Sequence, residues 1–237
     1  LLTADNNKIT EKHVVLNRVN AVPAESMADG VLQYGYAMEA DSSQVKNWQD
    51  GTDFAGLESG TTYYFFARIT GGTEYIDVTS AALPLTTKKI KLKKPVLSDS
   101  GSYIYSGNLI QASVTGFHAD EMTISDNVFR NTGSYIVKIS LNDTKHYEWE
   151  DGTSESVLLN WKITKKVITV KAANKNKYYG EENPTLTLEE LNEGVLAVGD
   201  KVSDLKVTLT TTADKNSAIG SYPITGKAAE DSNYAVT

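Results

Sequence analysis

The stretch Gly220-Ser221-Tyr222-Pro223-Ile224 repeats an earlier one, Gly133-Ser134-Tyr135-Ile136-Val137. In both copies a second tyrosine follows the first after twelve residues, at Tyr147 and Tyr234. A fixed spacing with variable residues between its ends is typical of repeated structural units. Each copy predicts a turn that begins at the glycine and leads into a strand, where the tyrosine ring packs on the core.

A weaker third copy, Gly60-Thr61-Thr62-Tyr63, is followed by Tyr75 at the same distance. The chain has 237 residues, a length that suits two or three domains. Three units of roughly 75–85 residues are each large enough to form a core without disulfides. We therefore predict a first module at residues 1–87, a middle module at 88–165 and a C-terminal module at 166–237.

The remaining pattern predicts an all-β protein. Threonine and valine are frequent, and turn residues separate short alternating runs at intervals of about 8–12 residues. The run 63–68 is almost wholly apolar, which indicates a central strand buried on both faces. Residues 188–196 have helical spacing but are interrupted by Gly194, so we expect one helical turn there at most. We expect further strands at residues 31–38, 133–141, 157–163, 167–170 and 207–211.

The predicted fold is a tandem array of three small antiparallel β-sandwiches, Ig-like in architecture. A β-grasp-like fold is the alternative for the middle and C-terminal modules. Residues 1–20 are either an edge strand of the first module or the tail of a preceding unit.

The composition excludes several classes of function. The net charge is −7, and an acidic chain without a basic face is a poor candidate for binding nucleic acid. No apolar run approaches the roughly 18–20 residues of a membrane helix, so we expect no membrane insertion. There is no cysteine, which excludes disulfides, thiol catalysis and thiolate metal sites. No signal peptide opens the chain, and we expect a mature or excised piece of a larger protein.

The residues that usually carry catalysis are scattered. The three histidines, His13, His118 and His146, have no metal-binding spacing. None of the turn serines stands in a Gly-x-Ser-x-Gly elbow. Adjacent acids on a strand point to opposite faces and do not form a catalytic pair. We therefore predict no enzyme activity and no catalytic, cofactor-binding or metal-binding residues. The turn serines are Ser59, Ser134 and Ser221, and the acidic doublets are Asp120-Glu121, Glu181-Glu182 and Glu189-Glu190.

Two further kinds of site stay open. Asp126-Asn127 or Asp214-Lys215-Asn216 offers loop oxygens to calcium, but no Asp-x-Asp-x-Asp-Gly loop is present. An isopeptide crosslink between lysine and asparagine, with Asn142 or Asn233 as the acceptor, would lower the intact mass by one ammonia.

The tryptophans Trp48, Trp149 and Trp161 allow two interpretations. They fill the cores of small sandwiches, or they form a platform that stacks on sugars. The period-two placing of aromatic residues favours the core.

The junctions between the predicted modules are short. Thr87-Lys88-Lys89 and Thr164-Lys165-Lys166 lack the glycine, serine and proline of a flexible linker. We predict that strands run almost directly from one module into the next. A lysine pair beside a strand also discourages pairing at a sheet edge.

Two family resemblances follow from these residues. Leu57-x-Ser59-Gly60-Thr61-x-Tyr63 resembles the Leu-x-Pro-x-Thr-x-Tyr corner of fibronectin type III domains, with serine in place of proline. The resemblance implies that Tyr63 contacts the backbone a few residues upstream. Tyr179-Gly180-Glu181-Glu182-Asn183-Pro184, together with the repeated Gly-x-Tyr, is similar to the MBG-type repeats of bacterial adhesins and cell-surface proteins. The middle module looks like a related β-module.

One difference separates the last two modules. The middle module ends in a closing strand, residues 158–163, which has no counterpart in the C-terminal module. Either that module is cut short and lacks its last strand, or it does without it.

The resemblances imply a function. We expect an extracellular stalk or adhesion segment of a large bacterial surface or secreted protein, monomeric and without cofactors, that spaces or presents a binding region. Its partners would be host or cell-surface glycans or glycoproteins and neighbouring repeats of the same chain. The alternative is a carbohydrate-binding accessory module of a secreted enzyme. Strands of seven to ten residues placed end to end in three modules would make a rod of about 100 Å.

Overall fold

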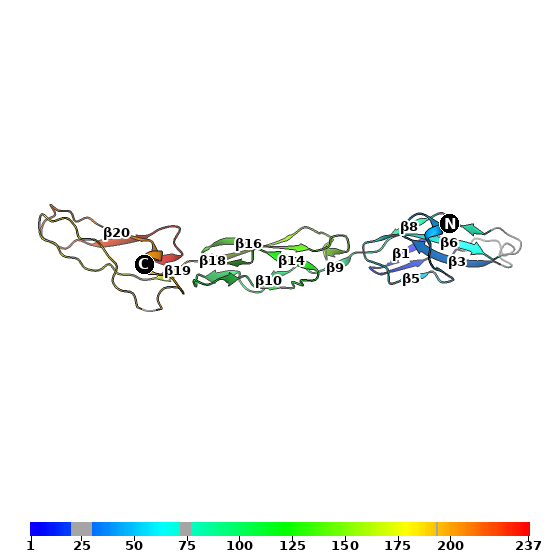
Figure 1. Ribbon diagram of the computed structural model, residues 1–237, viewed down its shortest axis with the longest axis horizontal. Coiled ribbons are helices and arrows are strands. Elements are labelled where there is room, and N and C mark those ends of the chain that lie inside the picture. The colour runs from blue at the N-terminus through cyan, green and yellow to red at the C-terminus, as the bar shows by residue number, and fades with distance from the viewer. Residues whose placement is uncertain (20–29, 72–76, 193) are drawn as a thin grey trace. The chain divides into compact units, whose positions relative to one another are not determined.

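The computed structural model describes residues 1–19, 30–71, 77–192 and 194–237 (Figure 1). Tyr75, the second tyrosine of the weakest repeat, lies outside the described residues. Within them, every regular element is a strand or a single 3₁₀ turn. The all-β prediction is therefore confirmed for the described part of the chain.

The chain divides into two compact units. Unit 1 comprises residues 1–94, 118–123 and 140–156, and unit 2 comprises 95–117, 124–139 and 157–237. The three-module division stays a prediction, and its names are kept below for the residue ranges alone. Each of the two predicted junctions lies inside one unit.

The first module contains two sheets. One has the order β1-β2-β5, with β1 at Ala4–Ile9, β2 at His13–Leu16 and β5 at Asp53–Ala55. The other has the order β4-β3-β6-β7, and β8 also pairs with β6. These strands are β4 at Trp48–Gln49, β3 at Val31–Ala37, β6 at Thr62–Thr70, β7 at Val78–Thr79 and β8 at Leu83–Thr86. A 3₁₀ turn, η2, spans Ser42–Gln44.

Side chains of both sheets form one buried cluster. Val14 of β2, Phe54 of β5 and Phe65 of β6 belong to it, together with Leu2 and Ile9 from the N-terminal residues. Of the two interpretations of the N-terminal residues, the edge strand is correct: β1 lies at the edge of its sheet and, among the described strands, pairs with β2 alone. The central position of β6 is confirmed as well, since it pairs with β3 on one side and with β7 and β8 on the other.

The predicted tyrosine corner is present. The Tyr63 hydroxyl accepts a hydrogen bond from the backbone N–H of Glu58 at 2.9 Å. Tyr63 stands at the start of β6 and is buried. The bond fixes the approach of the chain to the central strand, as the resemblance to fibronectin type III domains implies.

The middle module is built around the sheet β11-β18-β16-β14. Its strands are β11 at Ser102–Ile104, β14 at Met122–Ser125, β16 at Gly133–Leu141 and β18 at Val157–Thr164. Smaller pairs join β10 (Val96–Leu97) to β13 (Val114–Thr115) and β12 (Ile110–Gln111) to β15 (Val128–Phe129). A parallel pair joins β9 (Ile90–Leu92) to β17 (Tyr147–Trp149).

The C-terminal module has fewer strands. A parallel pair joins β19 (Lys166–Ile168) to β22 (Tyr234–Val236), and an antiparallel pair joins β20 (Val207–Thr211) to β21 (Ile224–Ala228). A 3₁₀ turn, η3, spans Val202–Leu205, beyond the 188–196 segment where one helical turn was allowed.

The repeated Gly-x-Tyr has a structural cause. The Tyr135 hydroxyl donates to the carbonyl of Asn131 at 2.7 Å, and the Tyr222 hydroxyl donates to that of Ala218 at 3.0 Å, four residues back in both cases. A Cβ on Gly133 would lie 3.0 Å from the Tyr135 ring. The glycine therefore gives room for the ring to fold back toward the preceding turn.

The predicted strand at Gly220–Ile224 is only partly correct. β16 begins at Gly133, but β21 begins at Ile224, four residues after Gly220. Pro223 explains the difference, because proline has no N–H to donate to a neighbouring strand.

Candidate functional site

The first junction is hydrogen-bonded to the first module. Thr87 is buried between β8 and β9. Its Oγ1 donates to the Glu58 carbonyl at 2.6 Å and accepts from the Thr61 N–H at 3.0 Å. The next residue, Lys88, donates its backbone N–H to Thr10 at 3.0 Å. A segment with its backbone paired in this way is a continuation of the fold and not a linker.

A glycine permits close approach at this junction. Gly60 has φ +57°, and a Cβ at this position would clash with the carbonyl group of Lys145. Lys89 donates from Nζ to the carbonyl of the nearby Thr144 at 2.7 Å. The loop that precedes β17 therefore packs directly on the turn that precedes β6.

The second junction is shorter. β18 ends at Thr164 and β19 begins at Lys166, so Lys165 alone separates the two strands. Lys165 donates from Nζ to the carbonyl of Glu230 at 2.7 Å. The prediction that strands run almost directly between modules is confirmed at this junction.

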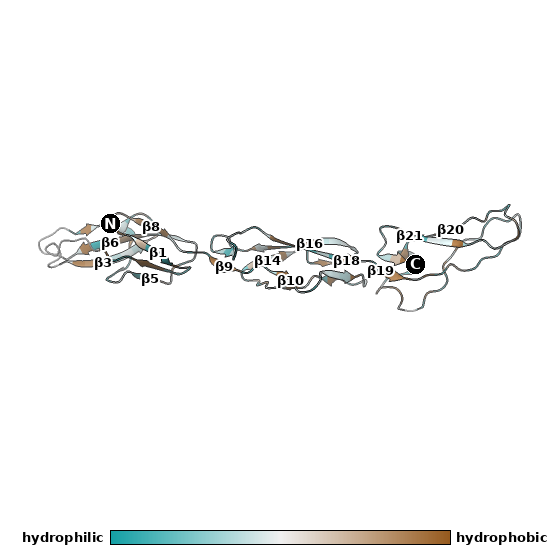
Figure 2. Cartoon of the chain, turned by 180° about the vertical axis from the view of Figure 1, so that it is seen from behind, coloured by the Kyte–Doolittle hydropathy of each residue, from teal (hydrophilic) through white to brown (hydrophobic). Residues whose placement is uncertain are grey.

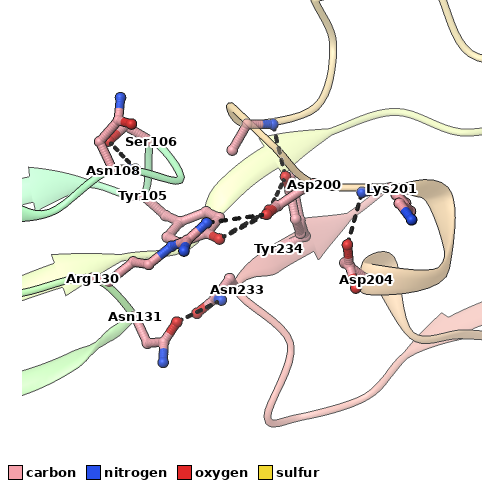
Figure 3. A network of polar contacts seen from close by, with 11 residues as sticks. Tyr105, Ser106, Asn108, Arg130, Asn131, Asp200, Lys201, Asp204, Asn233 and Tyr234 are labelled. Atoms are coloured by element: carbon pink, nitrogen blue, oxygen red, sulfur yellow. Dashed lines mark hydrogen bonds and ion pairs between the residues drawn. The ribbon is translucent and has the colours of Figure 1, made fainter.

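A buried carboxylate gathers the groups around the second junction (Figure 3). Asp200, whose side chain is 9% exposed, accepts hydrogen bonds from the hydroxyls of Tyr105 at 2.9 Å and Tyr234 at 2.7 Å. Arg130 places Nη2 4.0 Å from the same carboxylate. The Tyr234 hydroxyl in turn accepts from the Ala197 N–H at 2.8 Å. The two tyrosine hydroxyls and the Asp200 carboxylate are thus paired with one another, and the positive Arg130 faces the negative Asp200.

The environment raises the pKa of both tyrosines. Burial raises the pKa of Tyr234 to about 12, and the hydrogen bond to the Asp200 carboxylate contributes in the same sense. Burial also raises the pKa of Tyr105, again with a contribution from Asp200. Both hydroxyls therefore keep their protons at neutral pH and serve as donors to Asp200.

Two further contacts lock the junction. Asn233 accepts from the N–H of Thr132 at 2.9 Å and from its hydroxyl at 3.0 Å, and donates to Asn131 at 3.2 Å. Gly107 has φ +82°, and a Cβ there would clash with the backbone of Val198. The glycine again allows two backbones to approach closely, as Gly60 does at the first junction.

These contacts hold the segments on the two sides of the junction together. A polar pocket of about 450 Å³ adjoins the network and is lined by Arg130, Asp200, Asp204 and Lys206, among others. Its charged side chains are engaged: Asp204 accepts from the Lys201 N–H, and Lys206 pairs with Asp231. The geometry suits a rigid joint.

The three histidines are in separate places. His13 of β2 pairs with Asp53 of β5. Nδ1 of His146 is hydrogen-bonded to Oδ2 of Asp143 at 2.6 Å. His118 accepts backbone N–H groups through its carbonyl. Within the described ranges, no group of three or more histidines and acids is placed to hold a metal ion.

The other candidate residues take part in local structure. The acidic doublets lie in loops, not on strands as the sequence argument assumed, and Ser134 lies in β16. Asp214 accepts from the N–H of Asn216 and from the Ser217 hydroxyl. Asn142 donates to the carbonyls of Ala119 and Asp120, so its amide, like that of Asn233, bonds to groups other than lysine.

Two of the three tryptophans are buried. Trp149 is fully buried and Trp161 is 3% exposed, and neither can stack on a sugar. Trp48 is half-buried, and the Arg68 guanidinium lies 4.2 Å from its ring centroid. The core interpretation is correct for Trp149 and Trp161.

Sequence reasoning missed most of the junction residues. Tyr234 was marked by the repeat and Asn233 only as a crosslink candidate, but Asp200, Tyr105 and Gly107 carried no signal for a joint. Asp200 lies 95 residues from Tyr105. A contact between residues so far apart leaves no pattern in the local sequence. The pair Gly199-Asp200 by itself predicts only a turn.

Comparison with known proteins identifies one part of the chain. No curated protein matches it. Fibronectin(III)-like modules of CbhA from Clostridium thermocellum match 69% of this chain and 95% of their own, at 12% identity and a TM-score of 0.26, a similarity too low to support an argument. No helix among the described residues is both long and apolar enough to cross a membrane.

Residues 168–237 match the family profile of the MBG domain (YGX type). Modules of this kind are non-catalytic and typical of bacterial surface and secreted multidomain proteins. Residues 168–237 of this chain are therefore similar to MBG domains of the YGX type.

Proposed function

We propose that this chain is a non-catalytic extracellular segment of a bacterial surface protein, and that it spaces or presents a binding region. The MBG domain supports the bacterial surface setting. We further propose an Ig-like sandwich architecture for the modules and glycans or glycoproteins as the targets of the presented region.

The construction of the junctions is the observation that carries this proposal. At the second junction one residue separates β18 from β19, and Asp200, Tyr105 and Tyr234 bond across the joint. At the first junction the buried Thr87 bonds to the turn before β6. A spacer has to resist bending at its joints. Backbone hydrogen bonds and buried, paired polar groups supply that resistance, whereas a flexible linker would not.

Distance measurement between two spin labels tests the stiffness of the second junction. The chain has no cysteine, so Lys162→Cys on β18 and Lys227→Cys on β21 would introduce the only two labelling sites, both at exposed positions. A stiff joint predicts a single narrow distance distribution. A broad distribution, similar to that of the same pair in denaturant, would contradict the proposal.

A matched variant shows whether the joint itself is responsible. Gly107→Ala introduces a Cβ against the backbone of Val198 at a positive φ, so it should broaden or shift the distribution. Gly152→Ala is the control, because Gly152 also has a positive φ but has open space around its Cα. It should leave the distance unchanged.

Small-angle scattering tests the spacing role as a whole. Spacing requires that the modules follow one another along a line, and an elongated particle is the expected result. A compact particle would reject the role even if both joints were stiff.

A further inference from the structure

The charge of the chain reverses over one short segment. Five of the seven residues from 88 to 94 are lysines, in a chain whose net charge is −7. The segment spans the end of the first junction and β9 (Figure 2), and it contains no acid. An acidic chain thus carries a basic stripe that its net charge conceals. The lysines of the basic stripe are Lys88, Lys89, Lys91, Lys93 and Lys94.

The architecture that the two repeats share does not require this stripe. β9 and β19 are equivalent strands, because each pairs in parallel with the strand that contains the second tyrosine of its repeat. Ile90 lies opposite Tyr147, and Lys166 lies opposite Tyr234. The pairing of such strands is possible without the stripe, because three of its lysines have uncharged counterparts in this register. These counterparts of Lys91, Lys93 and Lys94 are Val167, Thr169 and Val170.

Two ammonium groups of the stripe are positioned by neutral acceptors of the neighbouring segment 144–150. Nζ of Lys89 donates to the carbonyl of Thr144 at 2.7 Å, and Nζ of Lys91 donates to the carbonyl of Glu150 at 3.3 Å. An ammonium group has three N–H donors. Since each of these bonds uses one donor, others remain for an anion.

Carboxylates offset part of the positive charge. Nζ of Lys94 lies 2.6 Å from Asp151, and Nζ of Lys91 lies 3.8 Å from Glu148. In the part of the chain that the structure describes, these are the ion pairs of the stripe. The side chain of Lys91 is still 56% exposed. The charges that no carboxylate offsets belong to Lys88, Lys89 and Lys93.

We propose that the basic stripe binds a linear anionic polysaccharide, a polymer of sugars that carry sulfate or carboxylate groups. Alternate residues of a strand share a face and lie about 7 Å apart, so Lys89, Lys91 and Lys93 form a row along β9 and one residue beyond each of its ends. Each would donate to an anion of the polymer, with release of the counterions of that anion. The inference does not rest on the spacer function, because the charge of one segment does not depend on the stiffness of the joints.

The charge distribution favours this partner over broader polyanions. Residues 1–87 contain eleven acidic residues against five basic ones, and residues 166–237 contain ten against eight. A nucleic acid duplex or an anionic membrane presents a broad charged surface, which the acids on both sides of the stripe in the sequence oppose. Ile90 and Leu92 are half-buried, so neither is free to insert into a membrane. A single polymer strand can follow the stripe alone.

A second copy of the chain is a poorer occupant. Three of the four residues from 148 to 151 are acids. Two of these acids already pair with Lys91 and Lys94, so this run is not free to bind the stripe of another molecule.

Titration calorimetry of the full chain with heparin, a sulfated and carboxylated polysaccharide, tests the proposal. Binding is expected at about 50 mM salt and should weaken steeply at about 200 mM, because counterion release drives it. Neutral dextran should not bind. Lys91→Gln combined with Lys93→Gln should lower the affinity for heparin about tenfold and reduce its salt dependence, because two ammonium contacts are lost. Absence of heparin binding at the lower salt concentration would overturn the proposal.

A matched pair of substitutions separates the stripe from the net charge. Lys138→Gln combined with Lys162→Gln removes the same charge from exposed positions of β16 and β18, and it should leave the affinity unchanged. Equal weakening by the two pairs would show that only the net charge matters and would overturn the proposal. Circular dichroism confirms that the variants fold. Lys93→Gln alone, outside β9, should still lower the affinity about threefold.

Two other results would assign the stripe to a different partner. Tighter binding of duplex DNA, or of phosphatidylglycerol vesicles, than of heparin at the same salt concentration would overturn the polysaccharide as the partner. Self-association of the chain without polymer, if it is abolished by the Lys91 and Lys93 substitutions, would make a second copy the occupant and the proposal wrong.

Discussion

The middle and C-terminal modules begin with the same arrangement and end with different ones. Both have a parallel opening pair and a tyrosine hydroxyl bonded four residues back. Among the described residues, no counterpart of β18 pairs with β21. Val137 and Ile139 of β16 are fully buried, while β20 and β21 have no buried residue. The burial of β16 therefore accompanies its pairing with β18.

The tyrosines of the repeat show the same effect. Tyr135 stacks on Phe129 with ring centroids 3.9 Å apart and lies 5.2 Å from Trp161 of β18. Tyr222, without such a partner strand, is 38% exposed. The predicted packing of the tyrosine ring on a core is therefore realised in the middle module, whereas Tyr222 stays at the surface.

Removal of the anchor of β18 should have the largest effect. Trp161→Ala removes a buried aromatic ring and should lower the free energy of unfolding of the middle module by about 3–5 kcal/mol. Denaturant unfolding, followed by hydrogen exchange of β16, measures it. Trp48→Ala is the control, because Trp48 is half-buried, and it should cost clearly less. Equal losses would mean that β18 does not close the core.

Removal of the Asp200 carboxylate at the second junction should have the next largest effect on stability. Asp200→Ala leaves the hydroxyls of Tyr105 and Tyr234 without their acceptor in a buried site. Loss of the partner of a buried polar group costs about 1–3 kcal/mol. Thermal unfolding should show the C-terminal module melting earlier and apart from the middle one. Asp214→Ala, in an exposed turn, should not separate the two transitions, and if it does so equally, the network is not what couples them.

The equivalent tyrosines of the two repeats, Tyr135 and Tyr222, should show a smaller effect on stability. Tyr135→Phe and Tyr222→Phe each remove one hydroxyl bond to a carbonyl. A hydrogen bond of this kind contributes about 0.5–1.5 kcal/mol, and less where water can replace it. The loss should be larger for Tyr135, which lies against Trp161, than for the more exposed Tyr222. The reverse order in chemical unfolding would mean that β18 does not shield the first tyrosine.

The pH dependence of the joint appears only in alkali. Because the pKa of Tyr234 is raised to about 12 from a reference of 10.0, the folded state favours the neutral hydroxyl. Its contribution to stability is complete below pH 10 and is lost as the pH rises from 10 to 12. Tyr234→Phe should remove this part of the alkaline destabilisation. A variant with the same loss between pH 9 and 11.5 as the unmodified chain would show that other groups cause it.

The sequence predicted the fold well where the pattern was local. Gly133–Leu141 and Val207–Thr211 form strands at the predicted bounds, and the Leu57 to Tyr63 motif marks the tyrosine corner. The sequence predicted less of the fold where the structure depends on contacts between residues far apart in the chain. The parallel pairings of β9, β11 and β19 join segments far apart in the chain, and Asp200 meets Tyr105 only through the fold.

Hydrogen exchange of the unmodified chain, without added peptide, tests the central claim most directly. The amides of β16 and β21 are compared, strand against strand, under conditions in which the chain is folded. The account predicts slow exchange throughout β16, and fast exchange at those amides of β21 that do not bond to β20. Equal protection of β16 and of both edges of β21 would contradict it, because the C-terminal sheet would then be closed.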